Sequence, residues 1–146
     1  MEKIVTTPLP QIRPPAVLDA YECWQLLPTE EVARVAWAGR DSVAIVPVNY
    51  AVVDKTLWFQ TQPYSQLGRH CDGARLALEV DQLDHATKSA WSVVVVGYAE
   101  VVAREEVPET VQQMQIWIPG PRSLAVRVSP VEVTGRRVWG RPPAQP

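Results

Sequence analysis

Two neighbouring β-type segments joined by a short turn constrain the fold of this 146-residue chain most strongly. Residues Val43 to Tyr50 and Thr56 to Thr61 are rich in β-branched and aromatic side chains, which favour extended strands. Asp54 and Lys55 lie between the two segments and are typical of a tight turn. The sequence therefore predicts an antiparallel hairpin over residues 43–61.

Further strands are predicted at residues 32–37, 75–80, 91–103, 123–128 and 131–139. Turn residues separate them at 39–41, 72–73, 81–84 and 129–130. Helices are expected at 17–27, where Pro28 would end the helical spacing, at 65–71, and at about 105–116, behind acidic residues and Pro108. Many short strands with few helices favour a barrel or a sandwich.

The length fits one domain with a core of its own. Proline-rich ends predict an extended segment at 1–16 and a tail at 142–146, on either side of a folded domain at 17–141. The N-terminus has no apolar signal core, and apolar runs are far shorter than the roughly 18 residues that span a bilayer, so we expect a cytoplasmic protein. The net charge of −2 gives no reason to expect nucleic acid or a membrane as a partner.

Four consecutive valines, Val93 to Val96, interrupt the alternation of apolar and polar residues that a half-buried strand shows. Both faces of this strand are therefore predicted to be buried, one in the domain core and one under something else. A second copy of the chain is the simplest cover, so we expect a homodimer.

Ser65 stands where the helix at 65–71 would begin. A hydroxyl at this place, with the free backbone N–H groups of the first helical turn, attracts an anion such as a phosphate. An ordinary helix cap explains the same serine. Pro47 lies in the middle of a predicted strand and lacks an N–H donor, which indicates an edge, a bulge or a displaced neighbouring strand.

These motifs, in their order, resemble the pyridoxamine 5'-phosphate oxidase-like FMN-binding split-barrel family, in its small actinobacterial type. The resemblance rests on Val46 to Tyr50, Thr56 to Thr61 and Tyr64 to Leu67, and it continues through Trp91 to Gly97 and Trp117 to Arg122. It implies a mostly β fold, an antiparallel split β-barrel, homodimeric, with FMN at the subunit interface. The implied activity is that of a flavin-dependent oxidoreductase acting on a small organic acceptor.

The resemblance also implies a set of cofactor contacts, with the flavin ring beside Pro47 and the phosphate at Ser65. The second subunit would contribute Trp91 and Ser92, although a tryptophan there is also a common core or interface anchor. Asn49 would face the ring or bond its own turn. The full set is Pro47, Val48, Asn49, Gln60, Thr61, Ser65, Gln66, Leu67, Arg69, Trp91, Ser92, Trp117, Arg122 and Arg136.

The chain departs from the family pattern at the phosphate. Gln60 and Gln66 stand where the family has an arginine and a lysine, and Arg69 could supply a cation from the same helix face. A second interpretation therefore stays open, namely a non-enzymatic or altered-ligand module that binds deazaflavin or haem.

No residue is identified as catalytic, and no spacing indicates a metal site, a phosphate loop or a hydrolase triad. Cys23 and Cys71 are predicted to be buried free thiols, and His70 to lie on a helix surface.

Overall fold

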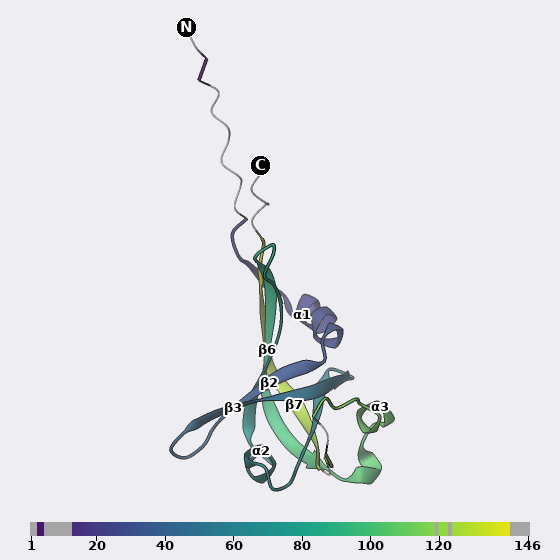
Figure 1. The fold of residues 1–146 in the computed structure, drawn as a ribbon. Helices are drawn as coiled ribbons and strands as arrows, with labels where there is room; N and C mark the ends of the chain where they lie inside the picture. The colour runs from purple at the N-terminus through teal and green to yellow at the C-terminus, as the bar shows by residue number, and fades with distance from the viewer. Residues whose placement is uncertain (1–2, 5–12, 119, 123, 141–146) are drawn as a thin grey trace.

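The computed structural model describes residues 3–4, 13–118, 120–122 and 124–140 (Figure 1). The described chain is mostly β, with strands at β1 (Ala16–Leu18), β2 (Val32–Ala38), β3 (Val43–Val53), β4 (Thr56–Thr61), β5 (Arg75–Asp84), β6 (Ser89–Val102) and β7 (Leu124–Val138). Short helices connect them, namely α1 (Ala20–Leu26), α2 (Gln66–His70), α3 (Glu109–Gln112) and the 3₁₀ helices η1 (Leu27–Thr29) and η2 (Arg104–Glu106).

Six strands close into an antiparallel barrel in the order β7-β4-β3-β2-β5-β6, because β6 also pairs with β7. The short β1 adds to the edge of β7, where Val17 lies opposite Arg136. None of the described helices is long and apolar enough to cross a membrane. The structure thus confirms the predicted split-barrel fold.

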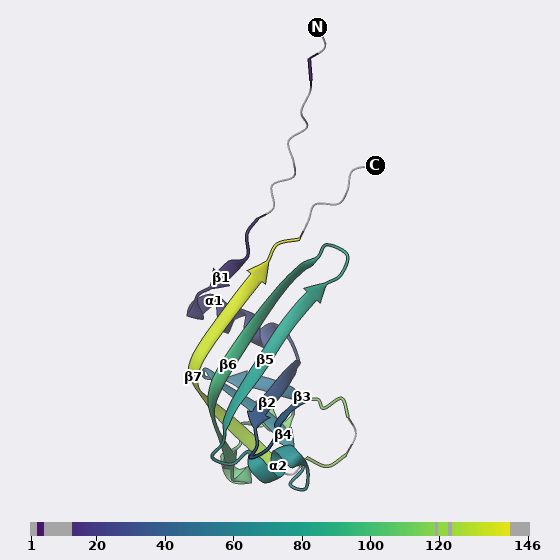
Figure 2. The same cartoon turned by 90° about the vertical axis from the view of Figure 1, so that its left-hand side faces the viewer.

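The barrel is drawn out at one end into a ribbon of β5, β6 and β7, and α1 packs behind the ribbon (Figure 2). Asp19 starts α1 as a capping box with Glu22. The buried Cys23 of α1 packs in the main core, with Leu18, Leu27 and Trp91. This helix therefore closes the open end of the barrel with apolar side chains.

Local signals in the sequence are followed closely at the first hairpin and at α2. Asp54 (φ 47°) and Lys55 (φ 57°) form the turn between β3 and β4, and a left-handed pair of this kind suits the twist of a hairpin. Ser65 caps α2 by accepting a hydrogen bond from the Gly68 N–H. The predicted hairpin turn at Asp54-Lys55 and the predicted helix start at Ser65 are both confirmed.

β7 is one continuous strand, so the predicted turn at 129–130 is wrong. Ser129 and Pro130 instead lie opposite Tyr98 and Gly97, at a β-bulge. A side chain at Gly97 would overlap the carbonyl oxygen of Ser129, so only glycine lets the two strands approach here. Pro130 is tolerated because the bulge removes the need for its N–H.

Three element boundaries also differ from expectation. The helix expected at 17–27 begins only at Ala20, because Val17 and Leu18 pair with β7. The turn expected at 81–84 belongs to β5, which pairs with β6 up to Asp84. The helix expected at 105–116 is reduced to η2 and the four residues of α3, because Pro108 separates the two pieces.

The valine run of β6 buries one face completely and the other only in part. Val93 and Val95 are fully buried in the barrel, whereas Val94 and Val96 point outward and are half-buried. The inward face of this strand is therefore buried as predicted, and burial of the outward face by a second copy stays a prediction. Trp91 is also in the core of its own chain, at 6% exposure.

A second, smaller core lies outside the barrel. The η2–α3 segment packs over the outward faces of β4 and β7 and buries a cluster of Trp58, Val102, Val107, Val111 and Ala125. The residues after α3 then return to the barrel and form the irregular segment at 113–118, which leads to the functional site.

Candidate functional site

The barrel is split between β3 and β4. These strands pair only over Tyr50 to Val53 and Thr56 to Phe59. Beyond that point β3 pairs with β2 alone, and Gln60 and Thr61 pair with β7 alone. Pro47 lies opposite Arg34 of β2 in the stretch of β3 that has no partner on the β4 side, which agrees with its missing donor.

A pocket of about 400 Å³ occupies this split, and we call it the split pocket. Its walls come from β2, β3, β4, the start of α2, residues 116–118 and Arg122. The lining residues are Val32, Val46, Pro47, Val48, Asn49, Gln60, Thr61, Gln62, Ser65, Gln66, Leu67, Ile116, Trp117, Ile118 and Arg122.

Most of the candidate residues come together here, namely Pro47, Val48, Asn49, Gln60, Thr61, Ser65, Gln66, Leu67, Trp117 and Arg122. Four candidates do not line the pocket. Arg69 is exposed on α2, and Trp91, Ser92 and Arg136 lie on the β6–β7 ribbon, where Ser92 pairs with Arg136. The sequence analysis missed Val32, Val46, Gln62, Ile116 and Ile118, whose side chains carry no polar signal except at Gln62.

Thr61 and Ser65 form a compact hydroxyl pair at one end of the split pocket. Their side-chain oxygens lie 3.0 Å apart, and Ser65 also donates to the carbonyl of Gln62 at 2.7 Å. The Gly68 N–H donates to the Ser65 hydroxyl at 2.9 Å. A side chain at Gly68 would overlap the carbonyl oxygen of Gln62, so the tight turn before α2 requires glycine.

Asn49 ties the 113–118 segment to the barrel. Its Oδ1 accepts a 2.9 Å hydrogen bond from the backbone N–H of Trp117, and its Nδ2 donates to the carbonyl of Glu31 at 3.3 Å. The amide of Asn49 therefore shapes the pocket by holding one of its walls.

Cationic charge is scarce in the split pocket. Among the lining residues that the structure describes, Arg122 is the only lysine or arginine, and none is acidic. The amide of Gln60 is already engaged, because its Nε2 donates to the carbonyl of Val111 at 2.8 Å. The pocket is therefore apolar along its walls and polar at the hydroxyl pair and at Arg122.

The two cysteines take no part in this site. Cys23 and Cys71 are free and buried, as predicted, and burial raises the pKa of both thiols. A raised pKa keeps a thiol protonated and unreactive at neutral pH. His70 is exposed on α2, with its Nδ1 2.8 Å from the carbonyl oxygen of Gln66.

Comparison with known proteins now identifies the family. Residues 19–137 match the model of the pyridoxamine 5'-phosphate oxidase family. The chain belongs to this family. An uncharacterized protein of Mycobacterium tuberculosis is 32% identical over 127 residues, which cover 83% of this chain and 84% of that protein.

Solved structures of similar proteins have the same fold. The FAD-binding protein of Mycobacterium smegmatis matches with a TM-score of 0.69 and 28% identity, covering 85% of this chain and 98% of that one. A conserved protein of unknown function from Corynebacterium diphtheriae matches with a TM-score of 0.69 and 26% identity, covering 86% and 99%. These relatives are actinobacterial, and the predicted family resemblance is confirmed.

Proposed function

We propose that the split pocket binds a flavin, with FMN as the first candidate, and that the chain is a flavin-dependent oxidoreductase acting on a small organic acceptor. The observation that carries this proposal is the pocket itself, which brings together residues from three separate parts of the chain at the positions matching the flavin-binding family pattern. The FAD-binding relative from Mycobacterium smegmatis adds support for a flavin ligand.

The residues present fit such a ligand. A volume of about 400 Å³ is within the ordinary range of small-molecule pockets. Val46, Val48 and Ile116 offer apolar walls for a planar ring. The N–H groups of Gln66 and Leu67, in the first turn of α2, offer donors for a phosphate, and Arg122 offers a positive charge. The hydroxyl pair would donate to the phosphate by rotating away from the carbonyl of Gln62.

When bound, the flavin would supply the transfer of electrons or hydride. The polar lining residues are Asn49, Gln60, Thr61, Gln62, Ser65, Gln66 and Arg122, none of which is an ordinary acid or base at neutral pH. The role of the chain's own residues is therefore to bind and orient the ring and to exclude water from it. Pyridoxamine phosphate is a poor candidate for a substrate held in the split pocket alone, because Arg122 is the one cation among the described lining residues of this pocket and a flavin phosphate would compete for it.

We propose that the active form is a homodimer. The outward face of β2, β3, β5 and β6 exposes Val43 (80%) and Ile45 (63%) and leaves Val94 and Val96 half-buried. An apolar surface of this kind marks an interaction site. A second copy seated on it would bring Ser92 and Arg136 of one chain towards the pocket of the other, whereas Trp91 lies in the core of its own chain.

Flavin titration of the purified protein tests the proposal, with FMN and FAD added separately and binding followed by flavin fluorescence. Ser65→Ala should weaken binding, because it removes the hydroxyl pair. Gln66→Lys should tighten FMN binding about three- to tenfold, since an exposed lysine adds a cation near the phosphate at some entropic cost. The gain should shrink as salt rises. Equal affinities of the three proteins would place the phosphate elsewhere.

The second candidate function is a binding module without enzymatic activity, which holds deazaflavin or haem on the same fold. It is favoured by Gln60 and Gln66, which leave the phosphate end with fewer cations than the family pattern. The absorption spectrum of the purified protein decides between the two functions, because flavin, deazaflavin and haem absorb at different wavelengths. A haem spectrum, with no flavin binding on titration, would reject the first proposal.

A further inference from the structure

A second pocket, of about 300 Å³, lies directly beside the split pocket. It sits between the outward face of β4 and β7 and the η2–α3 segment, above the smaller core. We call it the arginine pocket, because Arg104 and Arg122 supply its charged groups, with Gln60 and Gln112 as the other polar residues. Val102, Val107 and Ala125 complete its lining.

The two arginines of this pocket have no carboxylate partner among the described residues. In contrast, Arg34 and Arg127 form salt bridges, Arg34 with Glu79 and Asp81 and Arg127 with Glu100. The side chain of Arg104 makes no hydrogen bond in the described part of the chain, and Arg122 donates only to the adjacent carbonyl of Pro121. Arg104 is exposed and Arg122 half-buried, so both guanidinium groups are open to a ligand. Two cations at one cavity, without a carboxylate partner in the described part of the chain, favour an anionic ligand.

The pocket has fixed walls as well as charge. Gln60 donates to the carbonyl of Val111 at 2.8 Å, and Gln112 donates to the carbonyl of Val107 at 2.9 Å. The first bond ties β4 to α3 across the cavity, and the second fixes the η2–α3 segment itself. A ligand group would therefore enter a cavity that is already formed, which lowers the entropic cost of binding.

Gln60 and Arg122 line both pockets, so the two cavities adjoin at these residues. We propose that the arginine pocket binds an anionic group, a phosphate or a carboxylate, of a ligand that reaches or lies beside the occupant of the split pocket. That the occupant of the split pocket is a flavin rests on the function proposed above. The anionic group would come from one of two sources, namely the second phosphate of a flavin dinucleotide or the acid group of a separate small substrate.

Arg104→Gln tests the site, because Arg104 lines the arginine pocket and not the split pocket. Arg40→Gln, at an exposed arginine between β2 and β3, is the matched control with the same change of charge. Arg104→Lys tests whether charge alone suffices. FMN and FAD are titrated by fluorescence and pyrophosphate by calorimetry at low salt, after thermal unfolding has verified that each variant folds.

We expect Arg104→Gln to weaken the binding of either FAD or pyrophosphate about tenfold. Arg104→Lys should recover part of the lost affinity, and Arg40→Gln should change no affinity by more than about twofold. A loss for FAD but not FMN assigns the pocket to the second cofactor phosphate. A loss for pyrophosphate with an unchanged FAD-to-FMN ratio assigns it to a separate anionic substrate.

The inference is overturned if all three ligands bind Arg104→Gln as they bind the wild type, or if the wild type binds neither FAD nor pyrophosphate. Pyrophosphate binding by a protein that takes up no flavin would reject the flavin function while supporting the anion site. The two proposals therefore fail independently.

Discussion

The two outward faces of the barrel differ in how their apolar side chains are covered. On one side, the η2–α3 segment covers β4 and β7, and Trp58 and Val111 are buried at 3% and 0% exposure. On the other side, Val43 and Ile45 remain exposed and Val94 and Val96 half-buried, and no described segment of the chain covers them. Figure 2 shows this bare side of the β5–β6–β7 ribbon towards the viewer, with α1 behind it.

In this fold an apolar side chain on an outward face is either covered by its own chain or left exposed. Trp58 and Ile45 both stand on outward faces, but only Trp58 has a cover supplied by its own chain. Burial of Trp58 therefore contributes to the folding of one chain, whereas burial of Ile45 would contribute to association. Substitutions on the two faces should separate these effects.

The largest effect is expected on the covered face. Trp58→Ala should lower the free energy of unfolding by about 3–5 kcal/mol, because it empties the centre of the smaller core and removes the hydrogen bond from its Nε1 to Thr56. Ile45→Ala, on the bare face, should cost about 0.5 kcal/mol or less in a monomeric protein. Urea unfolding at low protein concentration measures both. Similar losses at the two sites would contradict the distinction between the faces.

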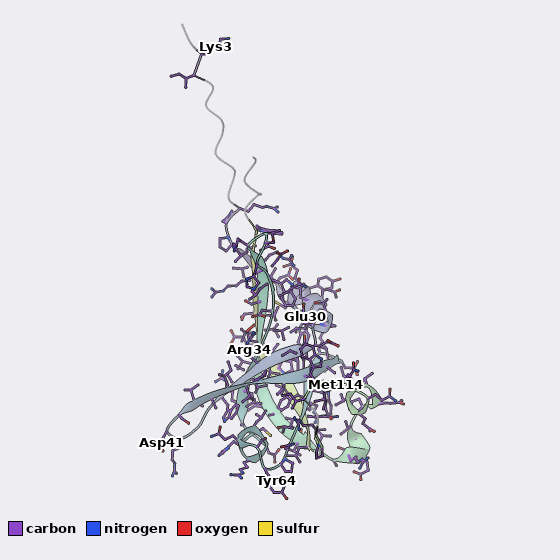
Figure 3. All side chains as sticks on the ribbon, viewed as in Figure 1. Lys3, Glu30, Arg34, Asp41, Tyr64 and Met114 are labelled. Atoms are coloured by element: carbon purple, nitrogen blue, oxygen red, sulfur yellow. The ribbon has the colours of Figure 1, made fainter. Side chains whose placement is uncertain are left out.

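The next largest effect is expected on the bare face. Ile45→Asp should leave the chain folded but weaken the proposed dimer by at least about a hundredfold, because it places a charge in an apolar interface. Tyr64→Asp is the control, since Tyr64 is 83% exposed in the loop before α2 (Figure 3). Sedimentation velocity at micromolar concentration reads out the result. A wild-type monomer, or an Ile45→Asp dimer, would remove this face from consideration.

Much of the fold could be predicted because its signals are local. The turn at Asp54-Lys55 and the cap at Ser65 depend on residues a few positions apart, and both are where the sequence indicated. The turn predicted at Ser129-Pro130 failed because its outcome depends on Gly97, which lies on another strand and leaves room for the bulge. The sequence alone cannot show that two such distant residues meet.

The same limit applies to the site. Pro47 and Ser65 could be singled out from local signals, a missing donor and a helix start, and the family resemblance supplied the other positions around them. Ile116 and Ile118 were missed because an irregular segment carries no periodicity that indicates which way it turns. Arg104 was missed for a different reason, since the predicted long helix at 105–116 concealed the break that forms the arginine pocket.

A smaller effect, a pH-dependent loss of stability, is expected from Glu79 on the bare face. On the bare face, burial raises the pKa of Glu79 to about 7, and the neighbouring Asp81 adds to this, while Arg34 opposes it. The unfolded chain has the ordinary value of 4.5, so the folded state holds this proton more tightly. Wild-type stability relative to Glu79→Gln should therefore fall as the pH rises from 4.5 to 7.

Thermal unfolding across this pH range measures the difference. Glu100→Gln is the matched control, because Glu100 is an exposed carboxylate whose partner, Arg127, lies on the side of the covered face. If the difference in stability between the wild type and Glu79→Gln stays constant from pH 4.5 to 7, then the Glu79 carboxyl does not titrate there and the bare face is more solvated than its geometry implies.

The smallest effect is expected at Asn49 of β3, whose side chain holds the 113–118 segment that follows α3. Asn49→Ala removes the acceptor of the Trp117 N–H, a bond worth about 0.5–1.5 kcal/mol, so amide exchange at Trp117 should quicken about two- to tenfold. Flavin affinity should fall by a similar factor, because one wall of the split pocket is released. Gln115→Ala, exposed in the same segment, should change neither quantity. If flavin affinity falls while amide exchange at Trp117 stays the same, then Asn49 acts by contacting the ligand. The 113–118 segment is then held in place without the Asn49 hydrogen bond.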